Sequence, residues 1–366
     1  MNPEIRLIRA LRLRAQGLVP GVREWRTAPD VARGMLAMQA QDGAAVRYAL
    51  SLRAAEQPDD AAVAADLAQG RIVRNRPARG TLQVTAPEDL HWLSDLLTPR
   101  SRDGAAKRRP QLGITDATIR AAENVIATRL SGGRTGTRPE LIEACAAAGV
   151  ELDGTQAGHV LRDLTEAMAI VFAHPTSKVD TFALANEWIT DQKVPTHALG
   201  ETISRFVAAR GPVTRQDIGK WTNLAMGSVD EGIEAAGDEI EAVVLAGTNY
   251  LTTKGATDID DRDVDAALAA PLLLPAFDEY IIGYGTRAPL LDESFFPRIV
   301  PGRNGMFKPL VVVDGEIVGT WARKTTAKAV TITVEPFRAL TAAAKRRLVG
   351  PAHAYARFLG LEATLV

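Results

Sequence analysis

The feature that most constrains the fold is a pattern of helices followed by two short strands, which recurs along residues 1–256. In its clearest copy, helices are expected over 196–210, 212–221 and 227–236, and strands over 239–245 and 250–253. Helix starts and ends are indicated by Pro, Asp or Thr at one end and Gly at the other. Helices followed by a two-stranded turn are the order of a winged helix-turn-helix unit.

Two further copies precede this one. The first has helices opened by Thr27-Ala-Pro-Asp30, expected to run into residues 39–41, and by Pro58-Asp-Asp60, and strands over 71–74 and 81–85. The second has helices over 139–149 and 156–168, strands over 169–174 and 180–184, and a turn at 175–179. Units spaced by about 60 to 90 residues indicate a tandem array. We expect winged-helix units at 1–112, 113–192 and 193–256.

After an Asp-rich linker at 257–265 the periodicity changes to that of strands. Runs at 272–282, 308–321 and 329–334 are β-type, and Asp314-Gly315 is a two-residue hairpin signal. A helix over 341–359 closes the chain. Residues 257–366 are therefore expected to form a small β domain, and the fold class is α+β, mainly α.

The charge distribution indicates a nucleic-acid partner more than the net charge of −1 does. Residues 1–112 hold 18 lysines and arginines against 12 acidic residues, whereas residues 229–265 hold 11 acidic and two basic residues. One face could therefore be cationic. The DNA-binding candidates in the first wing are Arg71, Arg74, Arg76 and Arg79. A second basic cluster at 100–109 lies in an expected linker, where phosphate contact and simple solvation both remain open.

Several classes of protein are disfavoured. The single Cys145 cannot form an internal disulfide, and the five scattered histidines offer no metal-ligand spacing, so we expect no metal. Neither a G-x-G-x-x-G nor a Walker loop occurs. No apolar run approaches the roughly 18 residues of a membrane span, and the N-terminus lacks a signal-peptide core. We expect no membrane partner, a cytoplasmic location and a monomer.

Gln39-Ala-Gln41 is the candidate catalytic motif. In an extended or helix-end backbone, side chains two residues apart can be aimed at one side of the chain. Each carboxamide offers an acceptor and two donor hydrogens, so a pair can fix the position of a water without deprotonating it. A solvated surface helix is the alternative for the same residues, because Gln is common there.

Two acidic residues are candidate members of the same site. Asp42 follows the glutamines and could add negative potential, or could simply be a helix-end surface acid. Asp278 and its neighbour Glu279 interrupt an apolar run, so each needs a partner or a purpose. Active-site placement and a structural ion pair remain equally open for Asp278.

Together these segments resemble the AlkZ-type DNA glycosylases, over nearly the whole chain. The resemblance is carried by Gln39-Ala-Gln41, Arg79-Gly-Thr-Leu82, Leu272-Leu-Leu-Pro-Ala-Phe-Asp-Glu-Tyr280, Asn304-Gly-Met-Phe-Lys-Pro309 and Val318-Gly-Thr-Trp321. It implies three tandem winged helix-turn-helix units plus a C-terminal β-barrel-like domain in a C-shaped arrangement. It also implies that Gln39 and Gln41 are catalytic, and that a C-terminal hairpin near Arg303 and Asn304, or at Asp314-Gly315, contacts DNA.

The reaction implied by this resemblance suits two neutral amides. Alkylation at N7 makes a purine cationic and weakens its glycosidic bond, so the remaining task is to place water beneath an oxocarbenium-like sugar. We expect a monofunctional glycosylase without cofactor, acting on N7-alkylguanine in double-stranded DNA, with cross-links as a further candidate substrate, and associated with the nucleoid when bound. A non-catalytic winged-helix DNA-binding or regulatory protein, or an interaction scaffold, is the alternative.

Overall fold

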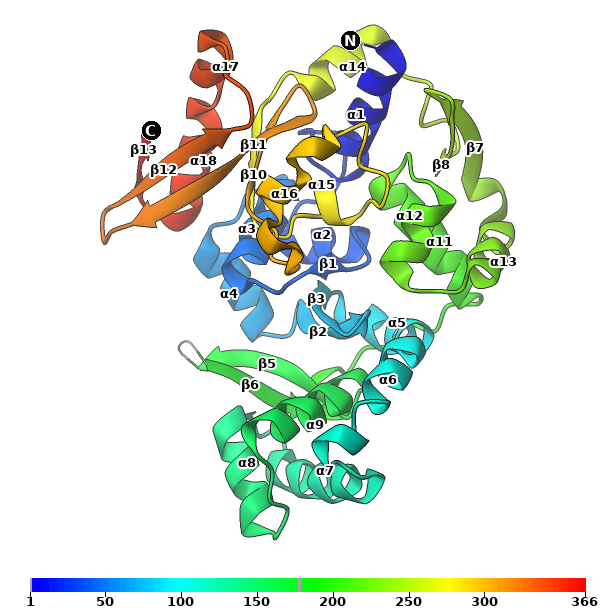
Figure 1. Cartoon of the computed structure of the whole chain (residues 1–366), viewed down its shortest axis with the longest axis vertical. Coiled ribbons are helices and arrows are strands. Elements are labelled where there is room, and N and C mark those ends of the chain that lie inside the picture. The colour runs from blue at the N-terminus through cyan, green and yellow to red at the C-terminus, as the bar shows by residue number, and fades with distance from the viewer. Residues whose placement is uncertain (1, 177–178) are drawn as a thin grey trace. The chain divides into compact units, whose positions relative to one another are not determined.

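The computed structural model describes residues 2–176 and 179–366 (Figure 1). The chain divides into two compact units. Unit 1 comprises Met1–Ala64, Leu199–Trp221 and Ala225–Val366, and unit 2 comprises Ala65–Ala198 and Thr222–Leu224. Roughly half of the chain is helical and the rest includes hairpins and an open sheet, so the structure is mixed α and β. The division into four domains, the count of three winged-helix units and the C shape stay predictions.

Unit 1 begins with helices whose starts are capped by side chains. The elements are α1 (Pro3–Ala15), α2 (Ala28–Gly34), β1 (Met38–Gln39), α3 (Gly43–Arg53) and the start of α4 (Asp60–Ala68). Thr27 and Asp30 form a reciprocal capping box on α2. The expectation that this helix runs into the glutamines was wrong, because the chain turns after Gly34, with Leu36 at a φ of 64°. Gln39 instead lies in the short strand β1.

The third predicted group of helices and strands is confirmed element by element. It consists of α11 (Ala198–Arg210), α12 (Arg215–Thr222), α13 (Met226–Ala236), the turn η2 (Gly237–Glu239), β7 (Ile240–Leu245) and β8 (Thr248–Thr253). The two strands pair antiparallel from Ile240 opposite Thr253 to Leu245 opposite Thr248. Their hairpin turn is Ala246-Gly247, where both residues have positive φ.

The C-terminal part of unit 1 is a five-stranded sheet in the order β13-β12-β11-β10-β9. Its strands are β9 (Leu272–Leu274), β10 (Leu310–Val313), β11 (Glu316–Thr325), β12 (Ala329–Pro336) and β13 (Glu362–Leu365). The Asp314-Gly315 hairpin joins β10 to β11 as predicted, with φ of 52° and 72°. The rings of Trp321 and Tyr355 pack edge to face, with 5.0 Å between their centres, in the core between this sheet and the helix at 349–359.

Three expectations for this part were wrong. The strand expected over 272–282 ends at Leu274, since Pro275 lacks an N–H and Asp278 caps the short helix α15 (Glu279–Ile282). The Asp-rich linker contains α14 (Asp261–Leu268), whose N-terminus is capped by Asp260, because acidic residues stabilise a helix start. The closing helix is broken at Leu348 into α17 (Ala342–Arg347) and α18 (Val349–Leu359).

Three short helical elements lie between α15 and β10 of this part. They are η3 (Glu293–Phe295), α16 (Phe296–Ile299) and η4 (Pro301–Arg303).

Unit 2 places two hairpins in one sheet, with its strands in the order β3-β2-β5-β6-β4. Arg74 of the first hairpin pairs with Phe172 of the second. The strands are β2 (Val73–Ala78), β3 (Thr81–Thr85), β4 (Gly136–Thr137), β5 (Ile170–Thr176) and β6 (Val179–Leu184). The helices are α5 (Pro87–Leu97), α6 (Pro99–Ala106), η1 (Pro110–Leu112), α7 (Asp116–Leu130), α8 (Arg138–Ala147), α9 (Gly154–Glu166) and α10 (Ala185–Trp188).

Two further expectations, both for unit 2, were wrong. β2 continues to Ala78, so Arg74 and Arg76 lie in a strand and the turn is only Arg79-Gly80, with φ of 56° and 66°. The basic cluster at 100–109 begins inside helix α6 instead of a linker. Of the turn expected at 175–179, residues 177–178 lie outside the described residues. Within the described part of the chain, no helix has the length and apolarity to cross a bilayer.

Candidate active site

The two glutamines lie on the short extended segment between α2 and α3 of unit 1. Gln39 is buried in β1, whereas Gln41 is exposed. Asp42 is the N-cap of α3, and its carboxylate accepts a hydrogen bond from the Ala45 N–H at 3.0 Å. Asp42 therefore fixes the start of the helix that follows the motif. This is the helix-end role that the sequence left open for it.

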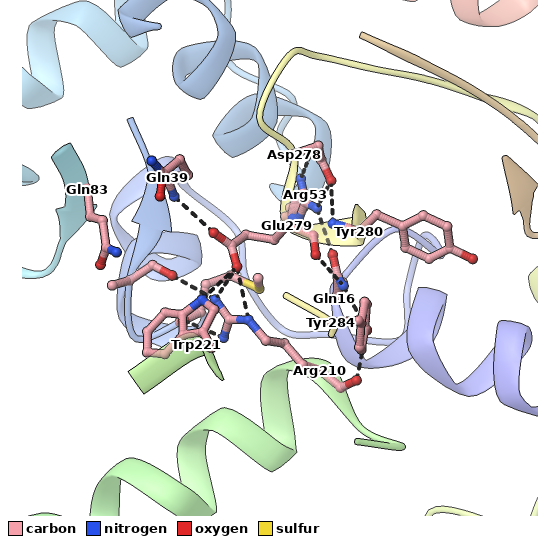
Figure 2. Close-up of polar contacts among 12 residues, drawn as sticks. Gln16, Gln39, Arg53, Gln83, Arg210, Trp221, Asp278, Glu279, Tyr280 and Tyr284 are labelled. Carbon is pink, nitrogen blue, oxygen red and sulfur yellow. Dashed lines mark hydrogen bonds and ion pairs between the residues drawn. The ribbon is translucent and has the colours of Figure 1, made fainter. Parts of the chain in front are cut away.

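A buried carboxylate holds the backbone of Gln39. The Gln39 N–H donates to Oε1 of Glu279 at 2.9 Å, and Glu279 is 1% exposed (Figure 2). The second oxygen, Oε2, accepts from Arg210 Nη2 at 2.8 Å and Nε at 3.1 Å, and from Trp221 Nε1 at 3.1 Å. Both oxygens of Glu279 are therefore engaged by donors of unit 1.

Arg210 extends this network to the turn that precedes the motif. Its Nη1 donates to the Met35 carbonyl at 3.0 Å and its Nη2 to the Ala37 carbonyl at 2.7 Å. Its guanidinium also lies 4.6 Å from the centre of the Trp221 ring. Removing a guanidinium from water is costly unless it is paired and hydrogen-bonded, and Arg210 is both. The ion pair between Arg210 and Glu279 thus holds the backbone before Met38, at Met35 and Ala37, and the backbone after it, at Gln39.

A second buried ion pair lies beside the first. Arg53 donates to both oxygens of Asp278, at 2.8 and 3.0 Å, and both side chains are fully buried. Asp278 also accepts from the Tyr280 N–H at 2.9 Å, as the cap of α15. Of the two alternatives open for Asp278, these contacts favour the structural ion pair. Its part in the reaction stays untested.

Gln16 and Tyr284 connect the two ion pairs. The Gln16 amide accepts from Arg53 at 2.9 Å and donates to the Tyr284 hydroxyl at 2.9 Å, and that hydroxyl donates to the Arg210 carbonyl at 2.8 Å (Figure 2). Burial raises the pKa of Tyr284 to about 12, so its hydroxyl stays protonated as a donor. The segment carrying Gln39 thus rests on a connected polar network of buried side chains, in which Nε of Arg53 has no hydrogen-bond partner among the described residues.

The predicted DNA-binding arginines of the first wing lie in unit 2. Arg71 pairs with Asp66, and Arg74 pairs with Asp180 at 2.8 Å. Arg76 is half-buried, and its Nη1 donates to the Gly80 carbonyl at 2.8 Å. Burial, and then the charge of Arg162, lower the pKa of Arg76. Arg79 lies in the turn between β2 and β3.

The two C-terminal segments expected to contact DNA differ in accessibility. Arg303 and Asn304 lie in an exposed loop between α16 and β10, and this loop is not a β-hairpin. The Asp314-Gly315 turn is packed against α1, since a Cβ on Gly315 would lie 2.7 Å from Arg9. The Gly315 carbonyl accepts from the Tyr280 hydroxyl at 2.7 Å. This turn is therefore inside unit 1 and not a free surface.

The hairpin between β11 and β12 is an accessible basic segment that the sequence reasoning missed. Its residues 322–328 are exposed and include Arg323, Lys324 and Lys328, and β11 runs well past the end of β10 (Figure 1). The signal was present as three basic residues between two runs of alternating apolar residues. Glu279 and Arg210 were also missed as a pair, because they are 69 residues apart in the chain.

Comparisons with known proteins agree with this fold. A family model described as DNA glycosylase AlkZ-like matches residues 32–358. An interstrand DNA cross-link repair glycosylase of Streptomyces sahachiroi is 24% identical over 350 residues, which cover 88% of this chain and 88% of that protein. The solved structure of Streptomyces sahachiroi DNA glycosylase AlkZ matches with a TM-score of 0.77 at 21% identity, over 100% of both chains. At this identity the structural match shows a shared fold.

Proposed function

Because this chain belongs to the AlkZ-like DNA glycosylase family, we propose that it hydrolyses the N-glycosidic bond of cationic N-alkylated purines, with Gln39 and Gln41 positioning the water. The family assigns the class of enzyme, a hydrolase of N-glycosidic bonds in DNA. The substrate and the roles of the glutamines are our proposal. The observation that supports it is the buried contact between the Gln39 backbone and Glu279.

The contacts of Glu279 explain why amides suffice in this reaction. A general base must have an oxygen free to take a proton, and the oxygens of Glu279 accept from Gln39, Arg210 and Trp221. Glu279 therefore fixes geometry and does not abstract the proton of water. A cationic purine leaves without being protonated, so a correctly placed water is the main requirement.

The same reasoning limits the substrate. Uracil or adenine leaves as an anion unless an acid protonates it, and general acid or base help is typically worth about 10² to 10⁴ in rate. Two amides supply no such help. N7-alkylguanine is therefore the preferred lesion, and a cross-link through N7 is chemically equivalent at the bond that breaks. The name of the Streptomyces sahachiroi relative supports including cross-links among the substrates.

Double-stranded DNA is the partner, and its contacts come from basic segments of both units. In unit 2 these are Arg71, Arg74, Arg76 and Arg79, and in unit 1 they are the loop at Arg303 and Asn304 and the exposed β11–β12 hairpin. Arginine and lysine contacts to phosphates position a duplex without reading its sequence. We propose that the enzyme acts as a monomer.

The test uses duplex DNA containing one 7-methylguanine, with released base measured under single-turnover conditions. Gln39→Ala, Gln41→Ala and the double variant are compared with wild type, and exposed Gln192→Ala serves as the matched control. We expect each site variant to lose about 10² in rate, as for the loss of one preorganised group. Release that is undiminished in the double variant would refute the site. Tight duplex binding by wild type without any release would support a non-catalytic binding protein.

A further inference from the structure

A cationic cleft lies within unit 2, and its lining includes neither of the glutamines assigned above to water positioning. It has a volume of about 430 Å³ and is walled by the β2–β3 hairpin, α8, α9 and the β5–β6 hairpin. Three arginines line it, Arg76, Arg138 and Arg162, and its apolar wall includes Leu82, Phe172 and Phe182. The cleft therefore combines cationic and apolar lining residues.

The guanidinium groups of this cleft keep unused donors. Nε of Arg162 donates to Glu166 at 2.6 Å, which leaves its two terminal nitrogens without a partner among the described residues. Nη2 of Arg138 donates to the Gly154 carbonyl. Nε of Arg76 is buried without a hydrogen-bond partner among the described residues. Buried donors are normally satisfied, so an unpaired one beside a cavity is consistent with a ligand acceptor.

The charges around the cleft are not balanced by its own acids. Asp180 pairs with Arg74 at 2.8 Å and Glu166 pairs with Arg162, so two carboxylates serve four arginines, and Arg76 and Arg138 form no direct ion pair within the described chain. The charges of Glu166 and Asp180 still act on Arg76 and oppose part of the lowering of its pKa. Burial and the neighbouring Arg162 both lower the pKa of Arg76, which means that its charge is held there at a cost. An anion in the cleft would offset that cost.

Gly80 keeps the hairpin close to these groups. Its φ is +66°, and a Cβ at this position would lie 2.1 Å from Nη2 of Arg162. The β2–β3 turn therefore lies in close contact with the Arg162 guanidinium and limits the number of rotamers open to that side chain. A restrained guanidinium loses little conformational entropy on binding, and its planar fork matches two oxygens of a phosphate.

We propose that this cleft binds one phosphodiester group of the DNA backbone, with Arg138 and Arg162 contacting the phosphate oxygens and Arg76 behind them. An apolar wall suits the deoxyribose that adjoins a phosphate, and a free orthophosphate would leave most of the volume empty. The proposal rests on DNA as the partner of the enzyme, and adds Arg138 and Arg162 to its contacts. It does not depend on which lesion is cleaved.

The test measures affinity of the full-length protein for a fluorescent undamaged duplex between about 50 and 200 mM salt. Each phosphate contact contributes about one to the slope of log affinity against log salt. Arg162→Gln and Arg138→Gln should each reduce the slope by about one and the affinity by about tenfold, while Arg162→Lys should retain most of the slope. Arg120→Gln, on the exposed face of α7, removes the same charge outside the cleft and should change neither quantity.

Two further measurements make the outcome decisive. The rate of 7-methylguanine release at saturating enzyme should be unchanged in Arg120→Gln, which lies outside the cleft, whereas the enzyme concentration that gives half-maximal release should rise in Arg138→Gln. Orthophosphate at constant ionic strength should compete only weakly with duplex. Duplex affinity and slope equal to wild type in both glutamine variants would overturn the proposal, and so would tight orthophosphate binding without any effect on duplex. Absence of base release by wild type would refute the proposed reaction and leave the duplex result standing.

Discussion

Glu279 provides a sharp test, because its neighbour Asp278 offers a matched control. Both carboxylates are buried and each is paired with a buried arginine, at 2.8 Å in both cases. Of these two carboxylates, it is Glu279 that accepts a hydrogen bond from the Gln39 backbone. Glu279→Gln and Asp278→Asn therefore make the same chemical change one residue apart. A difference in activity between them isolates the contact with residue 39.

The expected loss of stability is similar for the two variants. Removing one partner of a buried ion pair leaves the other charge uncompensated and typically costs about 3 to 5 kcal/mol. In Glu279→Gln the new amide also places an NH₂ against either the Gln39 N–H or the Arg210 guanidinium, where an acceptor is needed. Urea unfolding at 25 °C measures both losses.

The expected loss of activity differs between them. With an NH₂ facing either the Gln39 N–H or the Arg210 guanidinium, one of the two contacts that hold the motif is lost and the motif shifts. A displacement of about 1 Å can cost 10² in rate. Single-turnover release of 7-methylguanine is measured at a temperature where both variants are folded. We expect about a 100-fold loss for Glu279→Gln and less than about threefold for Asp278→Asn. Equal rates in the two variants would refute the positioning role of Glu279.

Two other predictions concern pH and DNA affinity. Burial, and then the charges of Arg162 and Arg109, lower the pKa of His159, so the unfolded chain takes up a proton before the folded one does. Stability should therefore fall as pH drops below about 6.5, the ordinary histidine value. The unfolding midpoint should fall less between pH 7.5 and pH 5.5 in His159→Gln than in wild type. In the control His353→Gln, whose side chain is exposed, the midpoint should fall as much as in wild type. On the β11–β12 hairpin, Arg323→Gln with Lys324→Gln should lower the salt slope of duplex binding by about two, whereas Lys345→Gln with Arg346→Gln on α17 should not. An unchanged slope in the hairpin variant would exclude that hairpin from the DNA contact.

Local signals in the sequence were sufficient for most helices and hairpins. The capping residues Thr27 and Asp30, and the Asp314-Gly315 turn, act through neighbouring atoms, so their effect is visible in a short window. The errors arose where a local pattern had two interpretations. The apolar run before Asp278 predicts a strand, yet a proline and a side-chain cap turn it into a helix start.

The glutamine motif of the candidate site could be proposed from the sequence. The buried side chains that hold its backbone could not. Gln39 and Gln41 could be named from a resemblance, but the pairing of Glu279 with residue 39 spans 240 positions and leaves no local pattern. The sequence suggested that both Asp278 and Glu279 needed partners. Only the three-dimensional arrangement showed that Arg53 takes one and Arg210 the other.

The interrupted course of unit 1 bears on when the enzyme becomes competent during its synthesis. The chain leaves this unit at Ala64 and returns at Leu199, so the ribosome delivers the glutamines early, then all but three residues of unit 2, and Glu279 much later. Domains commonly fold as they emerge, which favours completion of unit 2 first. A polypeptide that stops short of residue 279 would carry the motif on an unanchored backbone. Under the proposed role of Gln39 and Gln41, base excision therefore requires translation to pass the β9–α15 region, because the Glu279 contact that holds the motif forms only then.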